Sequence, residues 1–284
     1  ALQLAKTSTI KSEYPKNSMR NRLWLAINLM KQNRLVEAEV EAREALLEYI
    51  GLLGSRSLDT RWSVEVLATI LSKQGRHLEA KRLLDQLIAV MEAGGITDDS
   101  PIMGWTRYAL GNVLIDLGDW SGAAKQFRLA RGSLGKKSGL FFKKKYLLNT
   151  SPALALLRTG HSRDALRLLE KASEAADQDY GADHFRTVEI LGLFAVALFD
   201  TGNTSKAFDL FSGTVPSLLE NRVVGTQQKK LVLERYLNLL ARIRGTSVER
   251  QAGVDAVAEA FRIAGALQAQ SVQHALAQSL TRAA

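Results

Sequence analysis

The chain contains no cysteine. Disulfides, thiolate metal sites and a cysteine nucleophile are therefore excluded within these 284 residues. Only four prolines interrupt the sequence, and aromatic residues make up 7% of it. Alanine, leucine, arginine, glutamate and lysine are abundant, and these residue types favour helix. The composition therefore predicts a globular and largely helical protein.

Long apolar runs are also missing. No stretch approaches the roughly 18–20 apolar residues that a membrane-spanning helix needs. The opening stretch ALQLAKTSTIKSEYP lacks the charged start and the apolar core of a signal peptide. Because the sequence does not begin with methionine, we expect a processed form or a piece of a longer protein. We expect a soluble protein located in the cytoplasm.

The sequence shows no catalytic constellation. Its four histidines are far apart, and none has a second ligand at helical spacing. They are His77, His161, His184 and His274. No glycine-rich phosphate loop, nucleophile elbow or paired-carboxylate site occurs. We therefore predict that this chain is not an enzyme and holds no catalytic residue, metal ion or cofactor.

One pattern returns every 42 or 43 residues, marked by a residue that suits a turn. The turn residues are Asn33, Gly75, Gly118, Gly160, Gly202 and Gly245. Five residues after the turn stand Ala38, Ala80, Ala123, Ala165 and Ala207, and nine after it stand Ala42, Leu84, Phe127, Leu169 and Phe211. Seven residues before it stand Ala26, Ala68, Gly111, Ala153 and Ala195, and four before it stand Leu29, Leu71, Leu114, Leu156 and Leu198. A register kept at so many positions indicates a structural repeat.

Each repeated position has a physical reason. Glycine or asparagine adopts the left-handed conformation that ends one helix and lets the chain reverse. Small residues on both sides of the turn let two antiparallel helices approach closely. Leucine and phenylalanine then fill the space between helix pairs. The repeat therefore predicts a series of helix-turn-helix units.

These residues resemble the tetratricopeptide repeat (TPR). Leu110-Gly111-x-x-Leu114 followed by Ala123-x-x-x-Phe127 is close to its L-G-x2-Y…A-x3-F pattern. The stretch YGADHFRT over 180–187 is similar to the G-x-D-H-P-x-T junction of kinesin-light-chain-type repeats, with Phe185 in place of proline. The resemblance implies an all-α, TPR-like right-handed superhelical solenoid of about six helix-turn-helix repeats.

The expected organisation follows the repeat. We predict an N-terminal segment over 1–17, which could be the remnant of a preceding repeat, a solenoid over 18–266 and a capping or linker helix over 267–284. Helix pairs are expected near 18–53, 57–93, 99–134, 139–178, 183–220 and 227–266. Pro152 should kink the first helix of the fourth pair. The sixth pair, whose second helix starts late at about Ser247, is a degenerate repeat typical of a solenoid end.

The resemblance also implies a binding groove. In tetratricopeptide solenoids the first helix of each pair lines the concave surface. The family's groove positions fall here on polar and aromatic residues and on the aliphatic or thioether residues Leu23, Ile27, Met30 and Ile115. The candidate groove residues are Arg20, Trp62, Glu65, Thr69, Trp105, Tyr108 and Asn112. Tryptophan and tyrosine beside polar residues are typical of peptide recognition. Alternatively, Trp62 and Trp105 pack between repeats as core.

The net charge of +9 is concentrated in one stretch. Residues 120–163 hold ten basic residues and no acidic one. The rest of the chain holds the other 28 of the 38 basic residues and all 29 acidic residues, so its charge is nearly balanced. The candidate docking residues are Lys125, Arg128, Arg131, Lys136, Lys137, Lys143, Lys144 and Lys145. Such a stretch attracts an acidic protein or peptide, or nucleic acid phosphates. It could equally be a solvated loop and helix face.

The C-terminal end, EAFRIA…QSVQHALAQS…RAA, is similar to the linker before the protease domain of bacterial CHAT proteins. In that family, long tetratricopeptide repeats precede a caspase-like domain. This resemblance implies a non-catalytic peptide- or protein-binding region that regulates a downstream protease domain. The alternative is a free-standing adaptor that docks an acidic partner through residues 120–163. A weaker alternative is a regulator associated with nucleic acid.

Overall fold

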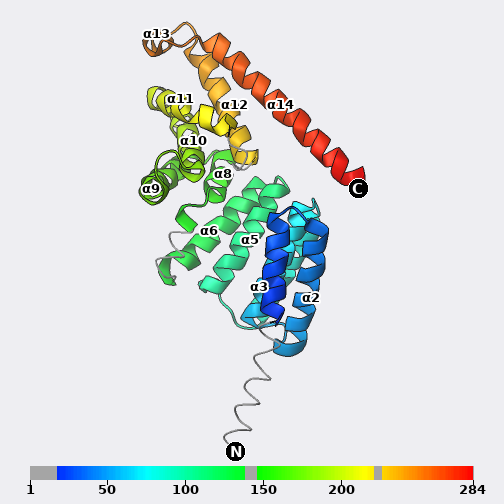
Figure 1. Cartoon of the computed structure of the whole chain (residues 1–284). Coiled ribbons are helices and arrows are strands. Elements are labelled where there is room, and N and C mark those ends of the chain that lie inside the picture. The colour runs from blue at the N-terminus through cyan, green and yellow to red at the C-terminus, as the bar shows by residue number, and fades with distance from the viewer. Residues whose placement is uncertain (1–17, 138–145, 221–225, 284) are drawn as a thin grey trace, which may run out of the picture. The chain divides into compact units, whose positions relative to one another are not determined.

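The computed structural model describes the backbone over residues 18–137, 146–220 and 226–283, and the side chains over 18–133, 146–220 and 227–269. Throughout these ranges the regular elements are helices, and no strand occurs (Figure 1). The chain divides into two compact units between Lys143 and Lys144. None of the described helices is long and apolar enough to cross a membrane.

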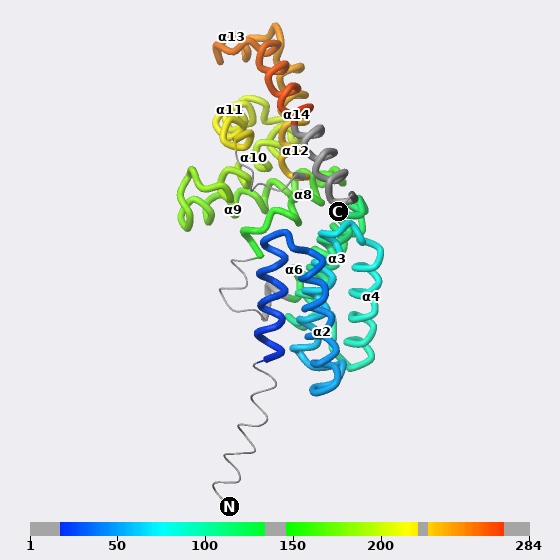
Figure 2. Tube along the Cα trace, turned by 45° about the vertical axis from the view of Figure 1, so that its right-hand side comes forward, coloured from blue at the N-terminus to red at the C-terminus, as the bar shows by residue number. Residues whose placement is uncertain are grey.

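The first unit is a succession of antiparallel helices (Figure 2). After a helix over 18–31, its elements are α2 (Leu35–Leu53), α3 (Leu58–Lys73), α4 (His77–Ala93), α5 (Pro101–Asp116) and α6 (Trp120–Lys137). From α2 to α6, each helix packs against the next one along the chain, and α3 also contacts α5. The first helices of the second and third pairs are therefore neighbours.

The second unit repeats this arrangement. Its elements are α8 (Ser151–Arg158), α9 (Ser162–Tyr180), α10 (Phe185–Asp200), α11 (Thr204–Glu220), α12 (Thr226–Ile243), α13 (Ser247–Ala252) and α14 (Ala256–Ala283). Helix α10 contacts α8, α9, α11 and α12, and α14 packs along α12. The apolar helix α10, whose buried residues include Val188, Leu193 and Val196, is thus the centre of this unit.

The six turn residues adopt the predicted left-handed conformation. The φ angle is +62° at Asn33 and between +74° and +94° at the five glycines. After each of the first five turn residues, the next backbone amide donates a hydrogen bond to the carbonyl of the repeated leucine, which stands four residues before the turn residue. Examples are Arg34 N to Leu29 O at 2.9 Å and His161 N to Leu156 O at 2.8 Å. This bond satisfies a carbonyl that a helix end leaves free. The role predicted for the turn residues is therefore confirmed.

The small repeated residues are also where close packing needs them. The five alanines that follow the turns are fully buried, as are the five residues at the leucine/phenylalanine position. At Gly111 of α5, an added Cβ atom would lie 2.6 Å from the ring of Phe127 on α6. Only glycine permits this separation of the two helices.

Two expectations about the second unit are wrong. Pro152 does not kink a helix, because α8 begins at Ser151 and the proline stands in its first turn, where its missing N–H is harmless. The boundary expected at 266–267 falls inside α14, which continues from Ala256 to Ala283. The late start at Ser247 is correct, but this helix ends at Gly253, whose left-handed φ of +64° separates α13 from α14.

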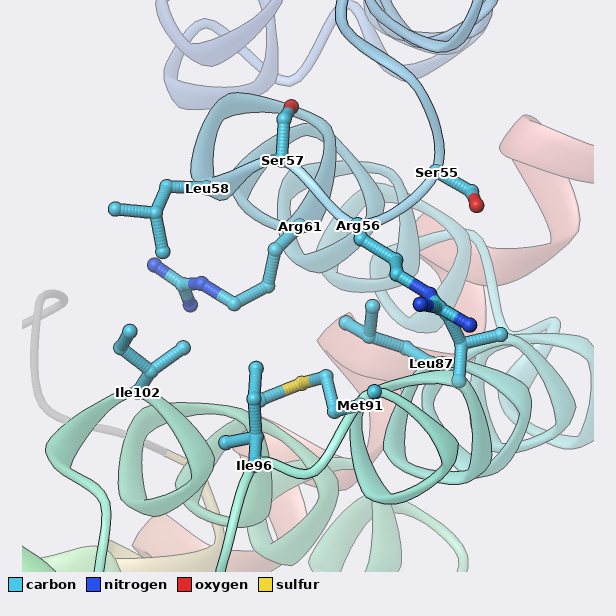
Figure 3. A pocket seen from close by; sticks show the side chains of 11 residues that line it. Ser55, Arg56, Ser57, Leu58, Arg61, Leu87, Met91, Ile96 and Ile102 are labelled. Carbon is cyan, nitrogen blue, oxygen red and sulfur yellow. The ribbon is translucent and has the colours of Figure 1, made fainter.

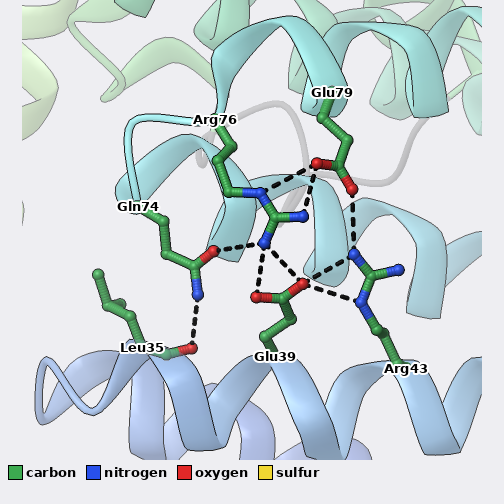
Figure 4. A network of polar contacts seen from close by, with 6 residues as sticks. All are labelled: Leu35, Glu39, Arg43, Gln74, Arg76 and Glu79. Atoms are coloured by element: carbon green, nitrogen blue, oxygen red, sulfur yellow. Dashed lines mark hydrogen bonds and ion pairs between the residues drawn. The ribbon is translucent and has the colours of Figure 1, made fainter.

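A polar network ties the first helix pair to the second (Figure 4). Arg76, at the turn between α3 and α4, donates to both carboxylate oxygens of Glu39 on α2 at 2.8 Å and to Glu79 on α4 at 2.9 and 2.6 Å. Arg43 on α2 joins the same two carboxylates. Gln74 completes it by donating to the carbonyl of Leu35 at 3.1 Å. These contacts fix α2 against α4 on the surface of the first unit.

Candidate peptide-binding groove

An exposed aromatic cluster lies on the first helices of the first unit. The rings of Trp24 and Trp62 meet edge to face, with centroids 5.6 Å apart, and Trp24 is 48% exposed. Trp62 on α3 is partly exposed. Trp105 on α5 is also partly exposed, with its ring centroid 6.0 Å from that of Tyr108. Both predicted tryptophans therefore keep part of their surface open to a partner.

Other candidates divide between the core and the surface. Tyr108 is buried at 9% exposure, with its ring 5.2 Å from Phe127, and Leu23 is fully buried. These two residues are core residues and are not free to line a groove. Arg20 and Thr69 are exposed, and Asn112 is partly exposed.

Glu65 is an acidic residue in a largely enclosed place. Its Oε1 accepts hydrogen bonds from Nη1 of Arg61, also on α3, and at 2.7 Å from the hydroxyl of Thr106 on α5. The side chains of Arg61 and Glu65 are only 16% and 14% exposed. Burial raises the pKa of the Glu65 carboxyl, while Arg61 and Thr106 partly oppose this rise. The hydrogen bond from Thr106 thus links α5 to Glu65 on α3, and burying the charged pair has a cost in desolvation.

Arg61 was not identified from the sequence, although the repeat contains the signal. It stands fourteen residues before its turn. The corresponding residues in the other copies are Met19, Gly104, Tyr146, Val188 and Leu231. All five are buried and uncharged. A charged residue at this position is an exception that the fold itself does not require.

A pocket of about 140 Å³ lies where the loop before α3 meets the end of α4 and the start of α5 (Figure 3). Two arginines and several apolar side chains line it. They are Arg56, Arg61, Leu58, Leu87, Val90, Met91, Ile96 and Ile102. No acidic residue belongs to this lining.

The basic stretch is only partly within the described residues. Lys125, Arg128 and Arg131 are exposed on α6. Their spacing of three places them along one side of the helix. The side chains of Lys136 and Lys137, and residues Lys143, Lys144 and Lys145, lie outside the described part. Among the residues that the structure describes, no group of three or more histidine or acidic side chains is placed to hold a metal ion.

Comparison with known proteins gives a family match and shared folds. Residues 153–171 match the family model of the tetratricopeptide repeat. A Podosopora anserina kinesin light chain with nearly identical TPR-like repeats has a TM-score of 0.56 at 18% identity, over 72% of this chain and 97% of that one. BtubC from P. vanneervenii has a TM-score of 0.55 at 15% identity, over 83% and 92%.

A third similar structure belongs to a much longer protein. It is a signal transduction ATPase of Pyrococcus horikoshii with a tetratricopeptide repeat sensor, at a TM-score of 0.55 and 14% identity. The match covers 93% of this chain and 38% of that one. No curated protein sequence matches the chain. The repeat register, the match over 153–171 and these shared folds together show that the described helices have the all-α fold of tetratricopeptide-type repeats.

Proposed function

We propose that this chain is a non-catalytic scaffold that binds a protein or peptide partner on the first helices of its first unit. The observation that carries this proposal is the exposed tryptophan pair formed by Trp24 and Trp62, with Trp105 on the neighbouring α5. Large aromatic side chains left open to water are typical of interaction sites and contribute much of the energy of a protein interface.

The polar groups around the tryptophans would orient the bound segment. Thr69 on α3 and Asn112 on α5 offer hydrogen-bonding groups on the same helices as Trp62 and Trp105, and Arg20 offers a positive charge. The buried Tyr108 would pack its ring against Trp105 rather than contact the partner. In this proposal the groove recognises an extended segment with at least one apolar or aromatic side chain.

A displayed peptide library provides the test. Peptides selected on the wild-type chain should bind the variants Trp62→Ala and Trp105→Ala at least about tenfold more weakly, as expected for central aromatic contacts. Trp120→Ala is the matched control, because Trp120 begins α6 and lies on no first helix. Equal binding by all three variants, each with an unchanged circular dichroism spectrum, would place the peptide elsewhere.

The scaffold would serve as the regulatory region of a larger protein with a downstream CHAT-type protease domain. The resemblance of the C-terminal end to the linker in CHAT proteins supports this finer proposal. The tetratricopeptide repeat sensor of the Pyrococcus ATPase is a parallel arrangement. Reading the gene beyond Ala284 tests it: a frame that continues into a domain with a His–Cys dyad supports it, and an immediate stop codon contradicts it.

A second candidate function is an adaptor that docks an acidic partner through the basic stretch. Lys125, Arg128 and Arg131 favour it, because three exposed positive charges share one side of α6. Changing all three to glutamate should abolish binding of an acidic peptide and leave the fold intact. Binding of DNA or RNA with a steep salt dependence, lost in the same variant, would instead favour a nucleic-acid partner.

A further inference from the structure

We propose that the pocket formed by the loop before α3, the end of α4 and the start of α5 binds a carboxylate carried on a short aliphatic chain, with Arg61 holding the carboxylate. This site is separate from the tryptophan groove and does not depend on its function. Figure 3 shows the guanidinium of Arg61 between Leu58 and Ile102, and the guanidinium of Arg56 on the other side of the pocket near Leu87.

The first reason is that Arg61 occupies a core position. All five corresponding residues in the other repeats are buried and uncharged, so the packing of a helix pair does not need an arginine there. A buried ion pair seldom stabilises a fold more than well-packed apolar residues of similar volume. The exception is therefore better explained by a ligand than by stability.

The second reason is an unsatisfied donor. Nη1 of Arg61 donates to Glu65, but its Nε atom is buried and has no hydrogen-bond partner. A buried guanidinium donor without an acceptor is costly. The Nε atoms of Arg22 and Arg235 are in the same situation, but neither of these arginines lines this pocket. A carboxylate oxygen in the pocket would accept this hydrogen bond, and the planar guanidinium suits a carboxylate in particular.

The third reason is the rest of the lining. Six apolar side chains from α3, α4, α5 and the loop between α4 and α5 form most of the wall. A small hydrated anion would leave this wall in contact with water, whereas an aliphatic chain would cover it. A volume of about 140 Å³ suits a chain of a few carbon atoms, because an apolar cavity of about 150 Å³ binds benzene. Arg56 is exposed and adds a second positive charge that Glu65 does not neutralise.

Such a carboxylate could belong to a free aliphatic acid or to the C-terminal aliphatic residue of a peptide. Sodium hexanoate is the probe for the first source, and acetyl-Gly-Leu with a free carboxylate is the probe for the second. The uncharged controls are 1-hexanol and the amidated peptide. Amide signals of Ser55, Arg56, Gly94 and Ile96, followed by NMR during titration, report binding in the full chain.

We expect hexanoate or the free peptide to shift these signals saturably, and the matching uncharged control to bind at least about tenfold more weakly, as for a lost charge-assisted hydrogen bond. Tighter binding of the peptide would identify a peptide terminus as the source, and tighter binding of hexanoate a free acid. Equal binding of charged and uncharged probes, or no saturable shift by either acid, would overturn the proposal.

Variants separate this site from the groove. Arg61→Lys keeps the positive charge but removes Nε, and it should weaken acid binding, while Arg82→Lys on the exposed side of α4 should not. Ile96→Trp should block the pocket without touching Arg61. Trp62→Ala, which removes a groove residue, should leave acid binding unchanged. Undiminished acid binding by both Arg61→Lys and Ile96→Trp would contradict the assignment.

Discussion

Trp24 and Trp62 form an edge-to-face pair with ring centroids 5.6 Å apart, although they belong to different helix pairs of the repeat. Trp62 was singled out from the sequence because it falls on a groove position, whereas Trp24 was not. The pair joins the helix over 18–31 to α3 and presents an aromatic surface to solvent. It therefore offers a specific test of where a partner binds.

Trp24→Ala should weaken binding of a groove-selected peptide by about tenfold, a typical loss for an aromatic interface residue. Because Trp24 is 48% exposed, the free energy of unfolding should fall by only about 1 kcal/mol. Isothermal titration and urea unfolding measure the two effects. A large loss of stability without a loss of affinity would show that the pair is structural only.

Glu65→Gln should change how stability depends on pH. Since burial raises the pKa of Glu65 above its ordinary value of 4.5, the folded state favours the protonated carboxyl. The contribution of Glu65 to the free energy of unfolding is therefore highest below pH 4.5 and falls as the pH rises through the raised pKa. Urea unfolding between pH 4 and 8 should show this fall in the wild type relative to the variant. A relative gain of stability with pH would contradict it.

Gly111→Ala should destabilise the first unit. The new Cβ atom would lie 2.6 Å from the ring of Phe127, which is buried and has little room to move. Overpacking of this kind costs about 1–3 kcal/mol. Gly132→Ala on α6 is the matched control, because its new Cβ would meet no atom within 4 Å. This substitution should stabilise the helix by up to about 1 kcal/mol. Thermal unfolding of both variants checks the opposite signs.

Asn33 should respond to substitution differently from an ordinary helix-end residue. Its φ of +62° is left-handed, which glycine adopts freely and alanine does not. Asn33→Gly should therefore match or exceed the wild-type stability, while Asn33→Ala should lose about 1 kcal/mol. Equal stability of the two variants in urea unfolding would show that the turn relaxes to another conformation.

The sequence was most informative where a single residue type is demanded by backbone geometry or close packing. The turn residues and the buried alanines, such as Ala80 and Ala165, follow from a left-handed φ and from close helix contact, and the first five repeats show both. Pro152 was misjudged because proline is harmful inside a helix but harmless in its first turn, and only the position of the helix start decides between them.

The candidate site was less predictable because burial depends on neighbours far along the chain. Tyr108 looked like a groove residue, but Phe127 of the next helix covers it. Arg61 was not singled out from the sequence, yet the end of α4 and the start of α5 enclose it beside Glu65. A comparison of the position fourteen residues before each turn would have singled it out.

The most direct test of the proposed groove follows the four indole N–H signals by NMR while a selected peptide is added to the full chain. The indole N–H signals of Trp24, Trp62 and Trp105 should shift in proportion to the bound fraction. The signal of Trp120, at the start of α6, should not shift. If Trp120 alone shifts, or no indole shifts although the peptide binds, the first helices of the first unit are not the binding surface.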